Sequence, residues 1–218
     1  MTPKERKLDL YFALKTHHAD AHCELTHETA FQLLCAVVMS AQTTDVAVNK
    51  VTPKLFAVFP DARALAKAQQ SDVEPLINSI GMYRQKAKNI IALSKILLAR
   101  FEGEVPSTMD DLLELPGVGR KTANVVLGVV FNRAEGVVVD THVGRISQRL
   151  GWTKESSPEK IEAALMKLLP KEEWSHASHV LIFHGRRICG AVRPQCDVCP
   201  VAKSCKSAGN AVLVGRKK

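Results

Sequence analysis

Several features that would direct the protein to a membrane or out of the cell are missing from its sequence. No uninterrupted apolar run approaches the roughly 20 residues that a membrane-spanning helix needs. The N-terminal segment MTPKERKLDL has no apolar core of the kind that a secretory signal carries. We therefore expect a soluble protein of the cytoplasm that contacts no membrane.

Strand-like sequence is almost absent as well. Only residues 137–139 (VVV) resemble a strand, and they are too few to found a sheet. Elsewhere the apolar residues follow a helical period, as in residues 86–101, whereas residues 31–39 are almost wholly apolar and predict a buried central helix. Helix starts are indicated by Asp61, by Ser157 before Pro158, and by a capping box from Ser71 to Glu74. The predicted fold class is all-α, without repeats or low-complexity linkers.

Acidic residues are scarce at the C-terminal end of the sequence. The net charge is +8, and residues 186–218 contain eight Lys or Arg and one acid, Asp197. A basic end of this kind suggests a polyanionic partner, although a solubilising tail would have the same composition.

Four of the six cysteines lie close together, in the pattern C-x6-C-x2-C-x5-C. Such crowding in a reducing compartment favours a metal over disulfides, and both an iron–sulfur cubane and a zinc ion accept four thiolates. Zinc sites usually contain two Cys-x-x-Cys pairs, so the single pair here favours iron. Cys23 and Cys35 fit no pattern and are expected to be buried thiols. The proposed metal ligands are Cys189, Cys196, Cys199 and Cys205.

The segment LPGVGRKTANVV predicts two helices joined by a tight turn at Gly117, Val118 and Gly119. Glycines allow the backbone to approach a ligand closely, and the free N–H groups that begin the next helix, residues 120–131, favour an anion. This helix-hairpin-helix would hold a DNA phosphate without reading a base. An ordinary turn between helices is the alternative.

Two cations follow the turn, and helical geometry separates them. If Val125, Val126, Val129 and Val130 form the apolar stripe, Arg120 lies on the opposite face and Lys121 lies at the edge of the stripe. Partial shelter and the helix N-terminus both disfavour an ammonium, so Lys121 is expected to supply the neutral amine that a nucleophile needs. A second phosphate contact is the other possible role for Lys121.

The segment VVVDTHVGR supplies a carboxylate. Asp140 begins a helix that Gly151 can end, so Asp140 is expected to be its N-cap. A rigid carboxylate beside an amine suits attack at a sugar carbon, because it can stabilise a developing oxocarbenium ion or take a proton.

With these motifs in their order and spacing, residues 5–207 resemble the endonuclease III family of DNA glycosylases. The resemblance implies a 4Fe-4S cluster at the four cysteines. It also implies two α-domains with a DNA groove between them: a six-helix domain of residues 23–134, and a cluster domain of residues 1–22 plus 135–218.

The resemblance further implies a bifunctional glycosylase and abasic-site lyase, with Lys121 as Schiff-base nucleophile and Asp140 as its partner. Such enzymes remove oxidised pyrimidines from double-stranded DNA and cut 3′ to the abasic site by β-elimination. Because the sugar carbon is hidden in a duplex, the nucleotide must leave the stack. Gln42, in SAQTTD, would fill the gap, and Met82, in IGMYRQKA, would wedge between bases where the family commonly has Leu.

The remaining interpretations concern DNA contacts. Arg193 in the cysteine loop and His142 near Asp140 are candidate DNA contacts, whereas His176, His179 and His184 are expected to be surface or hydrogen-bonded core residues. Nothing in the sequence demands a second subunit, so we expect a monomer.

Two alternative functions are a monofunctional glycosylase and a non-catalytic, metal-stabilised DNA-binding module. Lys121 argues against the first, because monofunctional relatives lack a lysine at this position, and the pair of Lys121 and Asp140 argues against the second.

Overall fold

The computed structural model describes residues 1–209. Arg216, Lys217 and Lys218 of the predicted basic end lie outside these residues. Among the helices of residues 1–209, none is both long enough and apolar enough to cross a membrane.

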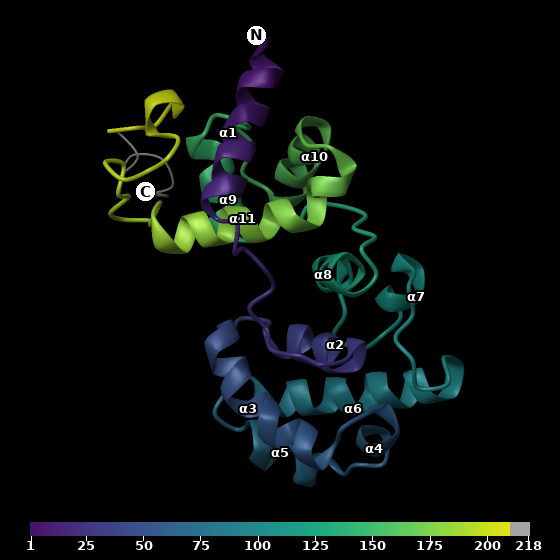
Figure 1. The fold of residues 1–218 in the computed structure, drawn as a ribbon. Coiled ribbons are helices and arrows are strands. Elements are labelled where there is room, and N and C mark those ends of the chain that lie inside the picture. The colour runs from purple at the N-terminus through teal and green to yellow at the C-terminus, as the bar shows by residue number, and fades with distance from the viewer. Residues whose placement is uncertain (210–218) are drawn as a thin grey trace. The chain divides into compact units, whose positions relative to one another are not determined.

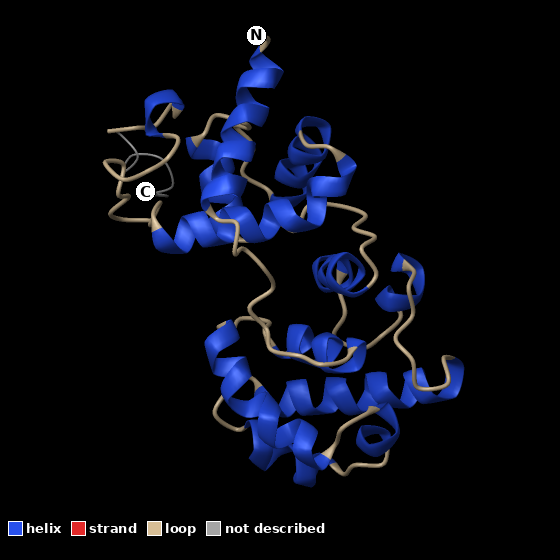
Figure 2. Ribbon diagram, viewed as in Figure 1, coloured by secondary structure: helices blue, strands red, loops and turns tan. Residues whose placement is uncertain are grey.

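The described chain divides into two compact units. The hairpin unit comprises Cys23–Asn132, and the cysteine unit comprises Met1–His22 together with the chain from Arg133 onward. Figure 2 shows helices and loops in both, and the all-α class predicted from the sequence is confirmed for residues 1–209. Residues 137–139 are buried but form no strand.

The hairpin unit is built around α2, Ala30–Met39, which buries eight of its ten residues and confirms the predicted central helix. Its longest helix is α6, which begins at Tyr83 rather than at Lys86 as the periodicity suggested. Both are seen in Figure 1. Helix α6 comprises Tyr83–Arg100. The other helices of this unit are α3 Asp45–Val58, α4 Ala62–Ala66, α5 Gln70–Ile77, α7 Met109–Leu113 and α8 Arg120–Val130.

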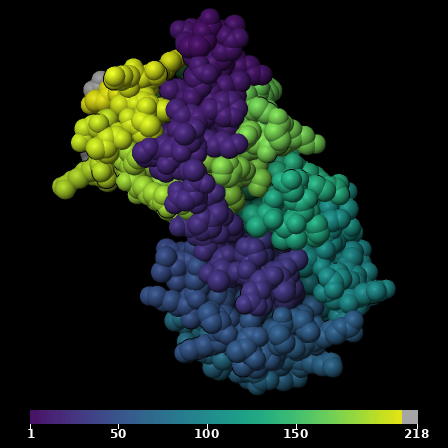
Figure 3. Space-filling model, viewed as in Figure 1, coloured from purple at the N-terminus to yellow at the C-terminus, as the bar shows by residue number. Residues whose placement is uncertain are grey.

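The cysteine unit brings the two ends of the described chain together. Figure 3 shows the N-terminal helix beside the C-terminal segment, where Arg6, Lys7 and Lys206 line a shared pocket. The core of this unit is separate from that of the hairpin unit. Its helices are α1 Pro3–His17, α9 Thr141–Arg149, α10 Pro158–Leu168 and α11 Trp174–Arg187, with the short 3-10 turns η1 Lys171–Glu173 and η2 Ala202–Ser204.

The helix starts agree with the sequence in two of three cases. The carboxylate of Asp61 caps α4 by accepting from the Ala64 amide at 2.8 Å, and Ser157 caps α10. The predicted capping box from Ser71 to Glu74 is wrong, because α5 begins at Gln70 and the carboxylate of Asp72 accepts from the amide of its N-cap, Gln69, at 3.3 Å.

A half-buried carboxylate attaches α1 to the start of α11. Glu173 accepts hydrogen bonds from Tyr11 Oη at 2.5 Å and from Lys15 Nζ at 2.6 Å. Burial raises the pKa of the Glu173 carboxyl, but the two hydrogen bonds and the Lys15 charge together bring that pKa below its ordinary value. A lowered carboxyl pKa stabilises the fold above the unfolded-state pKa, and this stabilisation is lost as the pH falls through the folded-state pKa.

We therefore predict that Glu173→Gln lowers the free energy of unfolding by about 1–3 kcal/mol at pH 7, the usual cost of breaking a hydrogen bond to a charged group. The difference from wild type should shrink below about pH 4, where the wild-type carboxylate also gains a proton. Urea unfolding at pH 7 and pH 3.5 measures both. Asp20→Asn, which breaks the exposed ion pair with Arg187, is the control and should change the midpoint little. Equal midpoints for Glu173→Gln and wild type at pH 7 would contradict the assignment.

Candidate active site

The turn from Pro116 to Gly119 joins α7 to α8 and confirms the predicted hairpin. Gly117 has φ +82°, and a Cβ at this position would lie 2.7 Å from Asn89 Nδ2 and 3.1 Å from Val38 Cγ1. Val118 is buried, and its amide donates to the Leu115 carbonyl at 3.0 Å. The turn therefore lies directly against α2 and α6, and only glycine fits at 117.

The first turn of α8 offers an uncapped N-terminus. Gly119 is the N-cap, no side chain caps the helix, and the first turn contains no acidic residue. The exposed hairpin end of α8 thus has the free N–H groups and the partial positive charge that suit a phosphate. The phosphate contact itself stays a prediction.

Lys121 lies in this first turn and is exposed. The predicted partial shelter is therefore wrong. The helix buries Ala123, Val126 and Leu127, with Asn124 and Gly128, instead of a stripe centred on the valines. Lys121 lies about 200° of helix rotation from Ala123 but only about 60° from Asn124, so its exposure follows from its place in the first turn, before the buried residues of the helix begin. Arg120 is also exposed.

Asp140 is the N-cap of α9, as the sequence indicated. Its Oδ1 accepts a hydrogen bond from the Val143 amide at 2.8 Å, and the residue is half-buried. At the other end of the helix Gly151 has φ +69°, and its amide donates to the Gln148 carbonyl at 3.0 Å. Because capping uses Oδ1 alone, Oδ2 is held in a fixed direction with no hydrogen bond to the described residues.

Gln42 and Met82 share an unusual backbone conformation. Their φ angles are +53° and +54°, and both are exposed. Non-glycine residues seldom adopt this left-handed region, and strained positions of this kind occur preferentially at functional sites. Met82 is 52% exposed, which is unusual for a large apolar side chain and excludes the alternative of a core methionine.

His142 packs toward α11. Its Nδ1 lies 3.1 Å from Arg145 Nη2, which also donates to the carbonyls of Gly185 and Cys189. A guanidinium has no acceptor, so His142 Nδ1 is the acceptor and the neutral ring carries its proton on Nε2. A DNA contact through that N–H stays a prediction.

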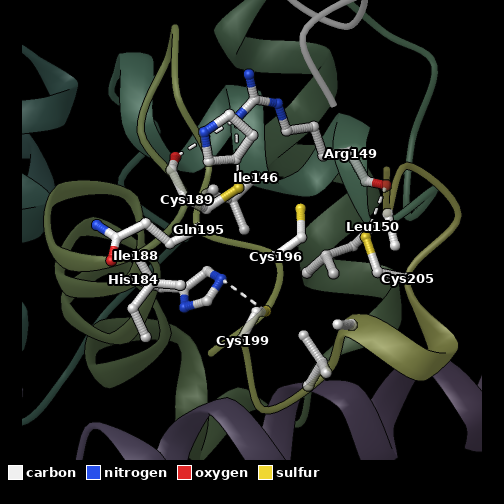
Figure 4. A pocket seen from close by; sticks show the side chains of 14 residues that line it. Ile146, Arg149, Leu150, His184, Ile188, Cys189, Gln195, Cys196, Cys199 and Cys205 are labelled. Carbon is white, nitrogen blue, oxygen red and sulfur yellow. Dashed lines mark hydrogen bonds between the residues drawn. The ribbon is translucent and has the colours of Figure 1, made fainter. Parts of the chain in front are cut away.

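Four cysteines line one pocket in the cysteine unit (Figure 4). Within residues 1–209, no three side chains of His, Cys, Asp or Glu are close enough together to bind one metal ion. The four are Cys189, Cys196, Cys199 and Cys205, and each is a free, half-buried thiol.

An arginine that sequence patterns do not single out lies behind this pocket. Arg149 is 1% exposed, and its Nη1 lies 3.2 Å from Cys189 Sγ and 2.7 Å from the Gly190 carbonyl. Burial and the neighbouring cysteines raise the pKa of the Cys199 and Cys205 thiols, because thiolates in a dry pocket repel one another. A bound cationic group would remove that penalty, so these residues fit a polynuclear iron–sulfur group.

The loop between the first two of these cysteines presents Arg193. An isolated antiparallel bridge pairs Cys189 with Pro194, and the Gln195 amide donates to the Ile188 carbonyl at 2.9 Å. These bonds close a short loop at whose tip Arg193 is exposed.

The two remaining cysteines and His184 lie in or near the cores. Cys35 is fully buried, as predicted, whereas Cys23 is half-buried. His184 is buried as expected, and lies 3.1 Å from His18 and 3.7 Å from Cys199 Sγ. The sequence did not indicate this proximity to a cysteine, because α11 and the C-terminal loop meet only in the folded unit.

Comparison with known proteins identifies the family. Residues 35–171 match the family described as HhH-GPD superfamily base excision DNA repair protein. Endonuclease III of a Synechocystis species is 49% identical over 205 residues, which are 94% of each chain. The chain belongs to the endonuclease III family. It is therefore a DNA glycosylase with abasic-site lyase activity, an enzyme of base excision repair.

Other endonuclease III proteins agree over nearly the whole chain. Endonuclease III of Escherichia coli K12 is 39% identical over 203 residues, 93% of this chain and 96% of its own. The solved structure of a trapped endonuclease III–DNA covalent intermediate has a TM-score of 0.88 at 45% identity, covering 96% of this chain and 98% of that one. A thermostable thymine-DNA glycosylase shares the fold, with a TM-score of 0.80 at 23% identity, covering 94% and 97% of the two chains.

The two hairpin glycines provide a matched pair of variants. We predict that Gly117→Ala lowers the free energy of unfolding by about 1–3 kcal/mol, because the added methyl group meets Asn89 and Val38 in a backbone region that alanine avoids. Gly119→Ala should change stability by less than about 1 kcal/mol, since φ is −101° and a Cβ there meets nothing within 4 Å. Urea unfolding of both variants tests this, and equal losses would show that the turn is not seated as described.

Proposed function

We propose that this enzyme removes oxidised pyrimidines from double-stranded DNA through a Schiff base on Lys121 and then cuts the strand 3′ to the abasic site. The observation that carries the proposal is the position of Lys121, exposed in the first turn of α8 immediately after a turn that suits a phosphate. A lysine there is accessible to the sugar of a strand whose phosphate the hairpin binds.

In this mechanism the neutral amine of Lys121 attacks C1′ of the damaged nucleotide. The bond between C1′ and the base breaks, and the base leaves with a proton that the attacking nitrogen gives up. The C1′–O4′ bond of the sugar ring then breaks, O4′ takes the remaining proton of the nitrogen, and the imine forms between C1′ and Lys121. Loss of a C2′ proton then expels the 3′ phosphate by β-elimination. Asp140 is proposed to stabilise the cationic sugar or to accept the amine proton through Oδ2, while Oδ1 caps α9.

Because Lys121 is exposed in the free protein, we propose that bound DNA excludes water from the amine. Gly117, Val118, Gly119 and Arg120 would bind the backbone, and Gln42 and Met82 would fill the duplex when the target nucleotide leaves it. Arg193 and His142 are proposed as further DNA contacts from the cysteine unit.

The four pocket cysteines are proposed to hold a 4Fe-4S cluster. The four thiolates would hold such a cluster, and the place of all four cysteines at one pocket supports this assignment. If bound there, it would cross-link the C-terminal loop that presents the exposed Arg193.

We further propose that residues 23–134 form one domain and residues 1–22 with 135–218 the other, an assignment supported by the two compact units of the described chain. The enzyme is proposed to act as a monomer on DNA inside the cell.

Borohydride trapping tests the nucleophile. With a thymine-glycol duplex, wild type should form a covalent complex, and Lys121→Gln should form none at any protein concentration, because an amide cannot make an imine. Arg120→Gln is the matched control from the same turn, and should weaken binding while keeping trapping at saturating protein. If Lys121 only contacts a phosphate, Lys121→Gln will trap at saturation as Arg120→Gln does, and the Schiff-base proposal fails.

Metal analysis tests the cluster. The purified protein should be brown, with a broad visible absorption and about four irons per chain. Cys196→Ser should lose the colour, whereas Cys23→Ala, which changes a thiol of the hairpin unit, should keep it. A colourless protein with one zinc per chain would overturn the assignment.

A further inference from the structure

Lys86 is a buried lysine that the proposed chemistry leaves unexplained. It follows the first turn of α6, is 3% exposed, and donates a hydrogen bond from Nζ to Thr43 Oγ1 at 2.6 Å. Burial lowers its pKa below the ordinary value for lysine. Within the described residues no carboxylate forms an ion pair with Lys86. Lysine is rarely buried without a partner charge, so this placement calls for a specific role.

The hydrogen bond links the neighbourhoods of two strained positions in the hairpin unit. Thr43 directly follows Gln42, and the Lys86 backbone amide donates to the Met82 carbonyl at 3.0 Å. The backbone of Lys86 is therefore bonded to Met82. Its ammonium is bonded to Thr43, the neighbour of Gln42. Gln42 and Met82 are two of the four non-glycine residues with positive φ in residues 1–209.

The next turn of the same helix supports the hairpin. Asn89 lies three residues after Lys86, its Oδ1 accepts from Gln85 Nε2 at 2.8 Å, and its side chain leaves room for Gly117 only because glycine has no Cβ. The first two turns of α6 thus contact the Gln42 loop, the Met82 loop and the hairpin turn.

We propose that Lys86 is a positioning residue that holds the Gln42 and Met82 loops in one fixed arrangement, so that both side chains enter the duplex together when the nucleotide leaves it. This inference rests on the proposed roles of Gln42 and Met82. Lys86 itself touches neither DNA nor the reacting atoms, because its side chain is buried. It acts before the chemical steps, by lowering the free energy that is needed to open the duplex.

This role predicts a difference between two substrates. A paired lesion must lose both its pairing and its stacking before excision, whereas an abasic site has no base to extract and opens more easily. Loosening the two loops should therefore slow lesion excision much more than it slows strand cleavage at a preformed abasic site. A residue that only stabilises the fold would affect both reactions equally.

The experiment measures single-turnover excision of thymine glycol and cleavage of a preformed abasic site by the intact enzyme. Lys86→Met should slow excision about tenfold, the factor that one hydrogen bond to a charged group carries, and should change abasic cleavage by less than about threefold. Thr43→Val removes the same hydrogen bond from the other side but leaves the Lys86 ammonium buried without its acceptor, so it should slow excision at least as much as Lys86→Met. The double variant should be no slower than the slower single variant, because both remove one interaction.

Ser94→Ala is the matched control. Ser94 is fully buried in the same helix and bonds only the Ile90 carbonyl, at 2.7 Å, so its loss should leave the ratio of the two rates unchanged. The inference would be overturned if Lys86→Met or Thr43→Val slowed both reactions by the same factor or left excision unchanged. Additive effects in the double variant would also overturn it. If wild type excises no lesion and traps no adduct, the proposed function itself fails. If wild type is active and the Lys86 variants have the same rates as wild type, only the role of Lys86 fails.

Discussion

Gly117 has no side chain, and for that reason the hairpin turn can lie against Asn89 and Val38. This contact fixes where α8 begins, and thereby where Lys121 and the free N–H groups of the first turn are held. It also joins the hairpin to α6, the helix whose start carries Met82 and whose buried Lys86 bonds Thr43 beside Gln42. The proposed phosphate contact, nucleophile and duplex-filling residues of the hairpin unit thus share one support.

Much of the fold follows from local sequence. The central helix and the caps at Asp61, Ser157 and Asp140 are predictable because each depends on residues close together in the chain. The environment of Lys121 is not predictable in this way. Hydropathy favours a face of valines, but α8 also buries Asn124 and Gly128, which a count of apolar residues leaves out, while Lys121 on the same side is exposed because it precedes the first buried residue of the helix.

The features missed entirely depend on contacts across the fold. Helical spacing places Lys86 on the same face of α6 as Ile90 and Leu93, but its charge favours solvent, and only the contact with Thr43 shows how the buried ammonium is accommodated. Arg149 is likewise an ordinary arginine at a helix end until the cysteine loop folds over it. In contrast, the four cysteines are identified by spacing alone, since metal ligands close in sequence need little tertiary information.

The central claim is that the amine at the start of α8 forms the covalent bond to DNA. Peptide mapping of the borohydride-reduced wild-type complex by mass spectrometry tests it most directly, because it locates the bond without altering the protein. The account predicts that the sugar remnant is attached to Lys121 alone. Attachment to another amine, such as Lys86 or the N-terminus, would contradict it.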